Sequence, residues 1–258
     1  MYKRRRLSII KNNLSNTKKL KRVHFQQNET IVTIIAKEEF IETAKEEIRK
    51  CRKEIEKFIE KDEFFKVTFE PYTCDNNAPE IIKKMCRSSE KFNIGPMSTV
   101  AGIIAEYAVK AMGAQGSKYA IVDNGGDIAI FVDKTVNIGI YTGNKYSGKF
   151  AFQILPSNRI IGVCTSSGNI GHSFSFGNAD AVTVISHDVS IADAAATALA
   201  NVVNGEKDIN DAFSTIKNVR EVIGAAVFVD NKIGLWGTVP KIFPAIVPYE
   251  LITKGVVI

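Results

Sequence analysis

The chain has 258 residues, of which 45% are hydrophobic and 24% are charged, so it can bury a substantial core without disulfide bonds. It contains no run of about 18 apolar residues that could span a bilayer, and its basic N-terminus lacks the apolar core of a signal peptide. Its four cysteines form no Cys-x-x-Cys pair, which argues against a zinc site and for reduced thiols. We therefore expect a cytoplasmic protein without a membrane partner.

The positive charge is concentrated at the N-terminus. Residues 1–24 contain nine of the 34 Lys and Arg residues and no acid, so the rest of the chain is slightly acidic. Such a segment can bind nucleic acid, but no series of aromatic residues accompanies it for base stacking, which argues against that partner. We interpret residues 1–24 as a basic arm, either a solvated tail or an edge strand protected by charge. Residues 25–258 are expected to form one domain or two closely packed lobes.

The first half of the chain predicts mainly helices. A strand rich in β-branched residues is expected at 30–35. Apolar residues recur at three- and four-residue steps over 37–62, which predicts a long amphipathic helix. The aromatic segment 64–69 is expected to form a short strand, and a short helix follows Pro79. A helix over 97–112 is apolar almost all round and should be buried.

The second half predicts hairpins and one further helix. A strand, a tight Gly-Gly turn and a second strand occupy 119–133, and Asp230-Asn231-Lys232 has the composition of a hairpin turn. The other expected elements are strands at 136–141, at two places within 150–163 and at 181–186, and a helix from 191 to about 203. Long helices between hairpins predict an α+β fold with largely antiparallel sheets and packed helices.

The first candidate site is the turn Asp123-Asn124-Gly125-Gly126-Asp127. Adjacent glycines permit positive φ angles and allow a phosphate or a flavin edge to approach backbone N–H groups. The alternative is an ordinary hairpin turn, for which Asn-Gly is the strongest short signal. Because Asn124-Gly125 alone could supply the positive φ angles, the additional Gly126 and the flanking acids exceed what a turn requires.

The second candidate site is Asp193 with Thr197. These residues are four apart, so a helix presents both on one face, and a carboxylate with a hydroxyl is a partial ligand set for Mg²⁺. The alternative is a capping box formed by Ser190 and Asp193, with Thr197 bonded to a backbone carbonyl. The spacing alone does not decide between them.

The third candidate site is the polar loop from His172 to Asp180. Its imidazole, hydroxyls and carboxylate could hold a ligand or transfer a proton, which makes His172 and Asp180 the candidate catalytic pair. Serine–histidine–aspartate catalysis is conceivable, but the chain has no Gly-x-Ser-x-Gly nucleophile elbow. A structural hydrogen-bonding role for His172 is the alternative.

Taken in this order, the segments between residues 95 and 205 resemble the ApbE-like proteins, the FAD:protein FMN transferases. Asn124-Gly125-Gly126-Asp127 is similar to that family's Asn-x-Gly-Gly-Asp turn, which contacts flavin, in shortened form. Ser166-Ser167-Gly168 resembles its Thr-Ser-Gly segment. The run from Ala192 to Ala198 closely resembles its Ala-Asp-Ala-x-x-Thr-Ala helix. The resemblance implies Mg²⁺ ligation by Asp193 and Thr197, and flavin contacts from the other two segments.

The chain also departs from the family's pattern. Where the family has Gly-x-x-Lys-Gly-Tyr-Ala-x-Asp, this chain has Ala105, Glu106 and Lys110 in place of the Lys, the second Gly and the Asp. The family's His-Ile-x-Asp-Pro-x-Thr-Gly element is also missing, and Gly171-His172-Ser173 stands in its place. The resemblance therefore implies a separate branch with the same fold, and it implies the reaction less strongly.

Two functions are expected from these features. The first is a Mg²⁺-dependent enzyme that acts on FAD or a related nucleotide, either transferring FMN to an acceptor protein or hydrolysing the pyrophosphate. The second is a non-catalytic protein that binds a flavin or another metabolite on the same scaffold. The altered positions Ala105 and Lys110 favour the second function, and the Asp193–Thr197 pair favours the first.

Overall fold

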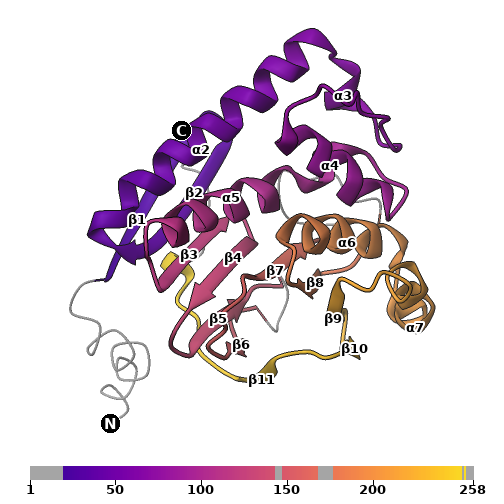
Figure 1. The fold of residues 1–258 in the computed structure, drawn as a ribbon. Helices are drawn as coiled ribbons and strands as arrows, with labels where there is room; N and C mark the ends of the chain where they lie inside the picture. Colours follow the sequence, from indigo (N-terminus) through magenta and orange to yellow (C-terminus); the bar gives the residue numbers. More distant parts are fainter. Residues whose placement is uncertain (1–19, 143–146, 168–176, 252, 254–258) are drawn as a thin grey trace.

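The computed structural model describes residues 20–142, 147–167, 177–251 and 253, which form three layers. An eight-stranded sheet lies between a layer of helices and a three-stranded sheet (Figure 1). All neighbouring strands are antiparallel, which confirms the predicted fold class. In spatial order, the large sheet contains β1 (Leu20–Gln27), β2 (Thr30–Lys37), β3 (Tyr119–Asn124), β4 (Asp127–Val132), β7 (Ile161–Ser166), β8 (Ala181–Ser186), β9 (Val222–Val229) and β10 (Lys232–Gly237). The small sheet contains β11 (Lys241–Pro244), β6 (Phe150–Ile154) and β5 (Val136–Ile140).

The helical layer covers one face of the large sheet (Figure 1). Its helices are α2 (Glu38–Lys61), α3 (Phe64–Val67), α4 (Glu80–Glu90), α5 (Val100–Ala114), α6 (Val189–Val202) and α7 (Ile209–Ala212), with 3₁₀ turns η1 (Pro96–Thr99), η2 (Glu206–Asp208) and η3 (Phe213–Thr215). A further 3₁₀ turn, η4 (Tyr249–Leu251), lies near the C-terminus and does not belong to this layer. In α2 the predicted apolar stripe is buried, and two acids in the first turn with Lys61 in the last complement the helix dipole. Helices α5 and α6 are buried on most sides because few of their side chains are polar.

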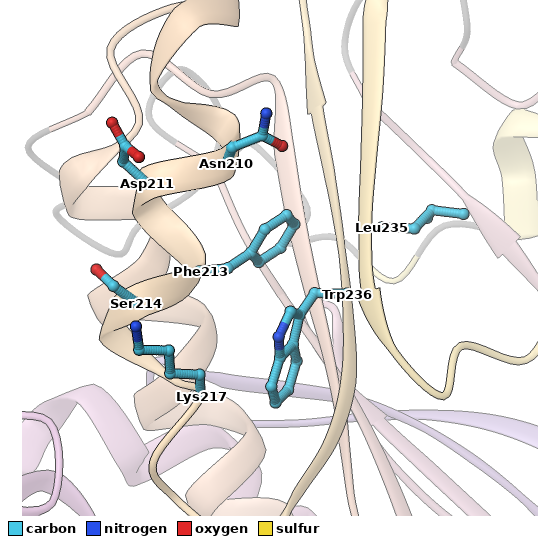
Figure 2. Close-up of a pocket in the computed structure, with 7 residues that line it drawn as sticks. All are labelled: Asn210, Asp211, Phe213, Ser214, Lys217, Leu235 and Trp236. Atoms are coloured by element: carbon cyan, nitrogen blue, oxygen red, sulfur yellow. The ribbon is translucent and has the colours of Figure 1, made fainter.

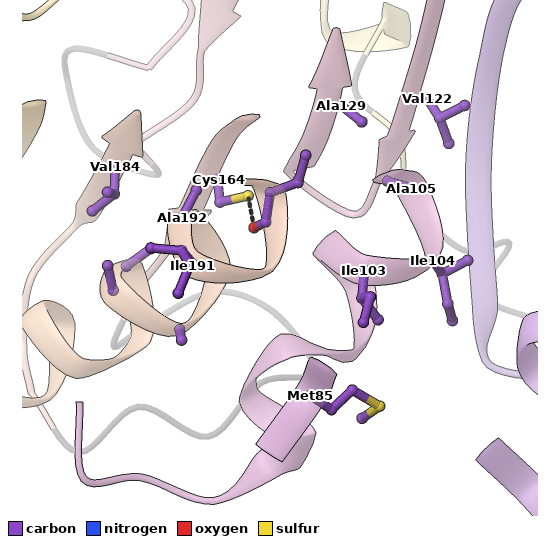
Figure 3. Close-up of a cluster of buried hydrophobic side chains, with 14 of the residues drawn as sticks. Met85, Ile103, Ile104, Ala105, Val122, Ala129, Cys164, Val184, Ile191 and Ala192 are labelled. Carbon is purple, nitrogen blue, oxygen red and sulfur yellow. Dashed lines mark hydrogen bonds between the residues drawn. The ribbon is translucent and has the colours of Figure 1, made fainter. Parts of the chain in front are cut away.

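Alternation along the central strands separates the core into two parts. Val122 and Val184 face the helices, where Ile103 of α5 packs in the same cluster (Figure 3). Ile121, which precedes Val122 on β3, points to the opposite face and packs against the small sheet together with Phe228. The same alternation determines whether a candidate site residue at the end of one of these strands points toward the helices or toward the small sheet.

The aromatic segment after α2 is a helix, so the predicted strand over 64–69 is wrong. Asp62 accepts a hydrogen bond from the backbone N–H of Phe64 at 3.0 Å and starts the helical turn of α3. Phe65 alone in this segment is fully buried among apolar side chains, in edge contacts with the rings of Phe58 and Tyr72. A strand would place Phe65 and Val67 on the same face, whereas Val67 is 63% exposed.

Strand β1 begins at Leu20, inside the segment that the sequence analysis assigned to the basic arm. Among the described strands it lies at the edge of the large sheet and pairs with β2. Its charged residues Lys21 and Arg22 fit the expectation of an edge strand protected by charge. Residues 1–19 of the arm lie outside the described residues.

Candidate nucleotide and metal site

The Gly-Gly turn joins β3 to β4 as a two-residue hairpin. Asn124 pairs with Asp127, and Gly125 and Gly126 form the turn with φ angles of +69° and +109°. Turns of type I′ require positive φ at both central residues. The hairpin therefore requires both glycines, and the prediction that Gly126 is more than the turn needs is wrong. Gly126 is held by hydrogen bonds from its N–H to Asp123 Oδ1 (3.0 Å) and to its carbonyl from the Thr165 N–H (3.2 Å).

The first turn of α5 connects this hairpin to α6. Asn124 donates from its side-chain amide to the carbonyl of Ala101 at 3.1 Å, and the next residue, Gly102, donates its N–H to Asp193 Oδ2 at 2.8 Å. A Cβ atom on Gly102 would lie 2.8 Å from the carbonyl oxygen of Val189 and 2.9 Å from Asp193 Cβ. Only glycine allows α5 and α6 to approach this closely. The turn and the Asp193 carboxylate are thus held to the same segment of backbone.

Asp193 does not cap α6, so the capping-box alternative is wrong. The N-cap is Asp188, whose Oδ1 accepts hydrogen bonds from the Ile191 N–H (3.2 Å) and from the Ser190 hydroxyl (2.6 Å). Asp193 lies in the second turn and is directed toward α5. Thr197, which is partly exposed, follows one turn later on the same face of α6.

Asp127 and Asp193 are buried carboxylates close to each other and to Cys164. Burial raises the pKa of Asp127 to about 7, and the charge of Asp123 adds to this shift. Burial and then the charge of Asp127 raise the pKa of Asp193 well above its usual range. Burial, with smaller effects from both carboxylates, likewise raises the pKa of Cys164, whose thiol donates to the Val189 carbonyl at 3.5 Å. Among the described residues, no Lys or Arg forms an ion pair with either carboxylate.

Ser166 lies beside this pair, at the end of β7. Asp127 is opposite Cys164 in the sheet, and Ser166 lies two residues further along β7, on the same face and past the Gly-Gly turn. Its hydroxyl is buried and has no hydrogen-bond partner among the described residues. Buried hydroxyl groups in native proteins nearly always have a partner, so this one is suited to a ligand.

Residues 12–219 of the chain match the model of the family described as AbpE bacteria. The chain belongs to this family. A UPF0280 protein of Methanococcoides burtonii is 48% identical over 234 residues, which cover 90% of this chain and 99% of the relative. The ApbE protein of Thermotoga maritima has a TM-score of 0.58 at 14% identity, covering 92% and 100% of the two chains. A mutant of the flavin transferase ApbE from Vibrio cholerae has a TM-score of 0.56 at 13% identity, covering 85% and 97%. At these identities, the solved structures show a shared fold alone.

The residues predicted as an acid–base pair are placed only in part in this AbpE family member. Asp180 precedes β8 at the same edge of the sheet as the Gly-Gly turn, and its Oδ2 accepts a hydrogen bond from the Asp230 N–H at 2.8 Å. His172 and Gly168 lie outside the described residues. Ser167, which precedes them, is partly buried directly after β7.

Glu106, which departs from the pattern of the resembled family, lies in a buried ionic cluster. Glu106 is 2% exposed, forms ion pairs with Lys84 (2.6 Å) and Lys110, and accepts the Val189 N–H at 3.0 Å. Lys84 also pairs with Asp188 at 3.1 Å. The sequence contains part of the signal, because Glu106 stands in a helix that is apolar almost all round and a buried acid needs a partner.

The AbpE family member also has a shallow pocket of about 580 Å³ between the α7–η3 segment and β10. Phe213 and Trp236 lie next to each other there, and Leu235 points to the other side of the strand (Figure 2). This pocket contains none of the predicted site residues and lies four strands from β4 in the sheet order.

Within the described ranges, none of the helices has both the length and the apolar character needed to cross a membrane.

Proposed function

We propose that this chain binds a flavin nucleotide together with Mg²⁺ and acts on it as an ApbE-type enzyme. The observation that carries the proposal is the buried carboxylate pair Asp127 and Asp193, for which no described Lys or Arg is a counter-ion. Two such carboxylates need a shared proton or a cation. The described residues contain no cluster of three or more His, Cys, Asp or Glu side chains suited to a metal. Mg²⁺ fits this sparse set because it uses one or two carboxylates and completes its shell with water and phosphate oxygens.

In this proposal Asp193 and Thr197 hold the metal from one face of α6. The metal supplies charge neutralisation at the pyrophosphate of the nucleotide. The hydrogen bond from Gly102 fixes the orientation of the Asp193 carboxylate, and the buried Ser166 hydroxyl is available to the ligand. The cofactor-binding residues are those of the hairpin turn and of the segment after β7: Asn124, Gly125, Gly126, Asp127, Ser166, Ser167 and Gly168.

The reaction that we propose is transfer of FMN to a hydroxyl group of an acceptor protein, or hydrolysis of the FAD pyrophosphate. Either reaction requires a group that removes a proton from the attacking hydroxyl or water. His172 and Asp180 are the proposed catalytic residues for this step. The position of Asp180 at the same sheet edge as the turn supports this role.

The second candidate function is binding of a flavin or another metabolite without catalysis. The ionic cluster favours it, because Glu106 stands where the resembled family has glycine and its carboxylate binds Lys84 and the start of α6. Ala105 is fully buried where that family has lysine, so no charged side chain can act from that position. The carboxylate pair Asp127 and Asp193 favours the enzymatic function.

Incubation of the purified protein with FAD and Mg²⁺ tests the proposal. Chromatography should detect FMN and AMP, or FMN bound to protein, and calorimetry should detect Mg²⁺-dependent binding of FAD. Asp193→Asn should abolish the Mg²⁺ dependence while preserving the fold, because asparagine keeps the volume and can still accept the Gly102 hydrogen bond. Asp211→Asn, an exposed change on α7, is the matched control and should behave as wild type.

The results distinguish three cases. FAD binding without product supports the non-catalytic function. If the Asp193→Asn variant binds Mg²⁺ with the same affinity as wild type, the metal does not bind at Asp193. A protein that binds neither FAD nor Mg²⁺ contradicts the proposal as a whole.

A further inference from the structure

A residue close to the C-terminus reaches the Gly-Gly turn from the face of the sheet opposite the helices. The side chain of Thr253 is buried against the side chains of Thr33 on β2 and Asp123 on β3, which are paired in the sheet. Its hydroxyl oxygen lies 2.5 Å from Asp123 Oδ2 and 2.7 Å from the hydroxyl oxygen of Thr33, which is fully buried. The second oxygen of Asp123, Oδ1, accepts the N–H of Gly126 at 3.0 Å. Asp123 therefore connects the C-terminal segment to the turn.

The directions of these hydrogen bonds can be followed from Asp123 outward. The Thr253 hydroxyl donates to Asp123 Oδ2. The single hydroxyl proton of Thr253 is then used, and Thr33 must donate to Thr253. Thr33 in turn accepts from Nδ1 of His24, 3.0 Å away on β1, which requires a proton on that nitrogen. The four side chains thus form one chain of donors that ends on Asp123.

The edge strand β1 also holds the segment that precedes Thr253. Arg22 lies two residues before His24 on the same face of β1 and donates to the carbonyl of Leu251 at 2.7 Å. Burial raises the pKa of Asp123, whereas the hydrogen bonds from Thr253 and Gly126 and the charges of Arg22 and His24 lower it. These donors and charges offset part of the effect of burial, and the pKa of Asp123 stays above its usual value.

We propose that Thr253 is a positioning residue for the nucleotide site, because it holds the Asp123 carboxylate in the orientation that fixes the Gly126 N–H and with it the Gly-Gly turn. The inference rests on the proposed function, in which the nucleotide approaches this turn. Gly125 and Gly126 have more conformational freedom than any other residue type, so the turn depends on such bonds for its shape. A turn that is not held pays an ordering cost when the ligand binds.

The test compares Thr253→Val, which removes the hydroxyl at nearly constant volume, with Thr253→Ser, which keeps it. Full-length variants are measured for FAD affinity in Mg²⁺ by flavin fluorescence and for amide hydrogen exchange by NMR. Thr253→Val should weaken FAD binding about tenfold, the loss expected for a hydrogen bond to a charged group, and accelerate exchange at Gly126 by a similar factor. Thr253→Ser should bind FAD within about twofold of wild type. Exchange at Ile121, in the middle of β3, should not change in either variant.

Two results would overturn the inference. One is wild-type FAD affinity in Thr253→Val, and the other is a loss in Thr253→Ser as large as that in Thr253→Val. If the wild-type protein binds no FAD, the proposed function fails, and exchange at Gly126 alone decides the positioning role. Faster exchange there in Thr253→Val supports the role, and unchanged exchange overturns it. Thr33→Val cuts the chain one step earlier and should produce the same effects at smaller size.

Discussion

Replacing Gly102 by alanine tests the contact between α5 and α6 on which the site depends. The new methyl group would lie 2.8 Å from the Val189 carbonyl oxygen, 2.9 Å from Asp193 Cβ and 3.1 Å from Asp193 Oδ2. The first two contacts are with backbone and with a side-chain atom next to it, so neither can move away by a simple rotation. The two helices must separate by a few tenths of an ångström. The hydrogen bond from the Gly102 N–H to Asp193 must lengthen with them.

Overpacking of this kind costs about 1–3 kcal/mol. The gain in helix propensity from glycine to alanine offsets at most about 1 kcal/mol of it. Gly113, in the last turn of the same helix, is the matched control, because an added Cβ there would have no atom within 4 Å. Gly113→Ala should therefore raise the free energy of unfolding by about 0.5–1 kcal/mol. The two substitutions are chemically identical, and their effects on the free energy of unfolding should have opposite signs.

Urea and thermal denaturation followed by circular dichroism measure both variants. For a chain of this length, Gly102→Ala should lower the melting temperature by about 2–10 °C, and Gly113→Ala should raise it slightly. Mg²⁺ affinity should fall in Gly102→Ala and not in Gly113→Ala. If both variants are stabilised to the same degree, α5 and α6 do not pack as closely as described, and the account of Asp193 orientation is refuted.

Three further predictions follow from the buried charges and the turn. In EDTA, the free energy of unfolding should fall as the pH rises from 5 to 7, by up to about 1 kcal/mol per pH unit. Burial raises the pKa of Asp127 to about 7, so the folded state binds that proton more tightly than the unfolded chain does. Asp127→Asn should flatten this slope, and a stability that rises over this range would contradict the shift. Gly126→Ala should cost on the order of 1 kcal/mol in thermal melts through its φ of +109°, whereas Gly205→Ala, at an extended and open position, should not destabilise. Glu106→Ala should cost about 3 kcal/mol in urea denaturation by leaving the buried start of α6 without its acceptor and Lys84 without a partner, and an effect as small as that of the exposed Lys110→Ala would exclude a structural role for the cluster.

The local features of this fold could be predicted from the sequence, because each depends on residues within a few positions of one another. The stripe of α2 is set by apolar residues at helical spacing, and the β3–β4 hairpin by two adjacent glycines between strand-forming residues. The shared face of Asp193 and Thr197 follows from the helical period alone. The strand predicted at 64–69 is wrong because the burial of Phe65 against Phe58 and Tyr72 outweighs the strand-like composition of this segment.

The tertiary structure decided which of these features belong to one site. Asp193 could cap its own helix or face a neighbouring one, and the close approach of Gly102, 91 positions away, decided for the second. Thr253 bonds to Asp123 across 130 positions, a contact that no local pattern encodes. Local spacing specifies which side chains share a face, whereas the pairing of distant faces depends on how the whole chain buries its apolar surface.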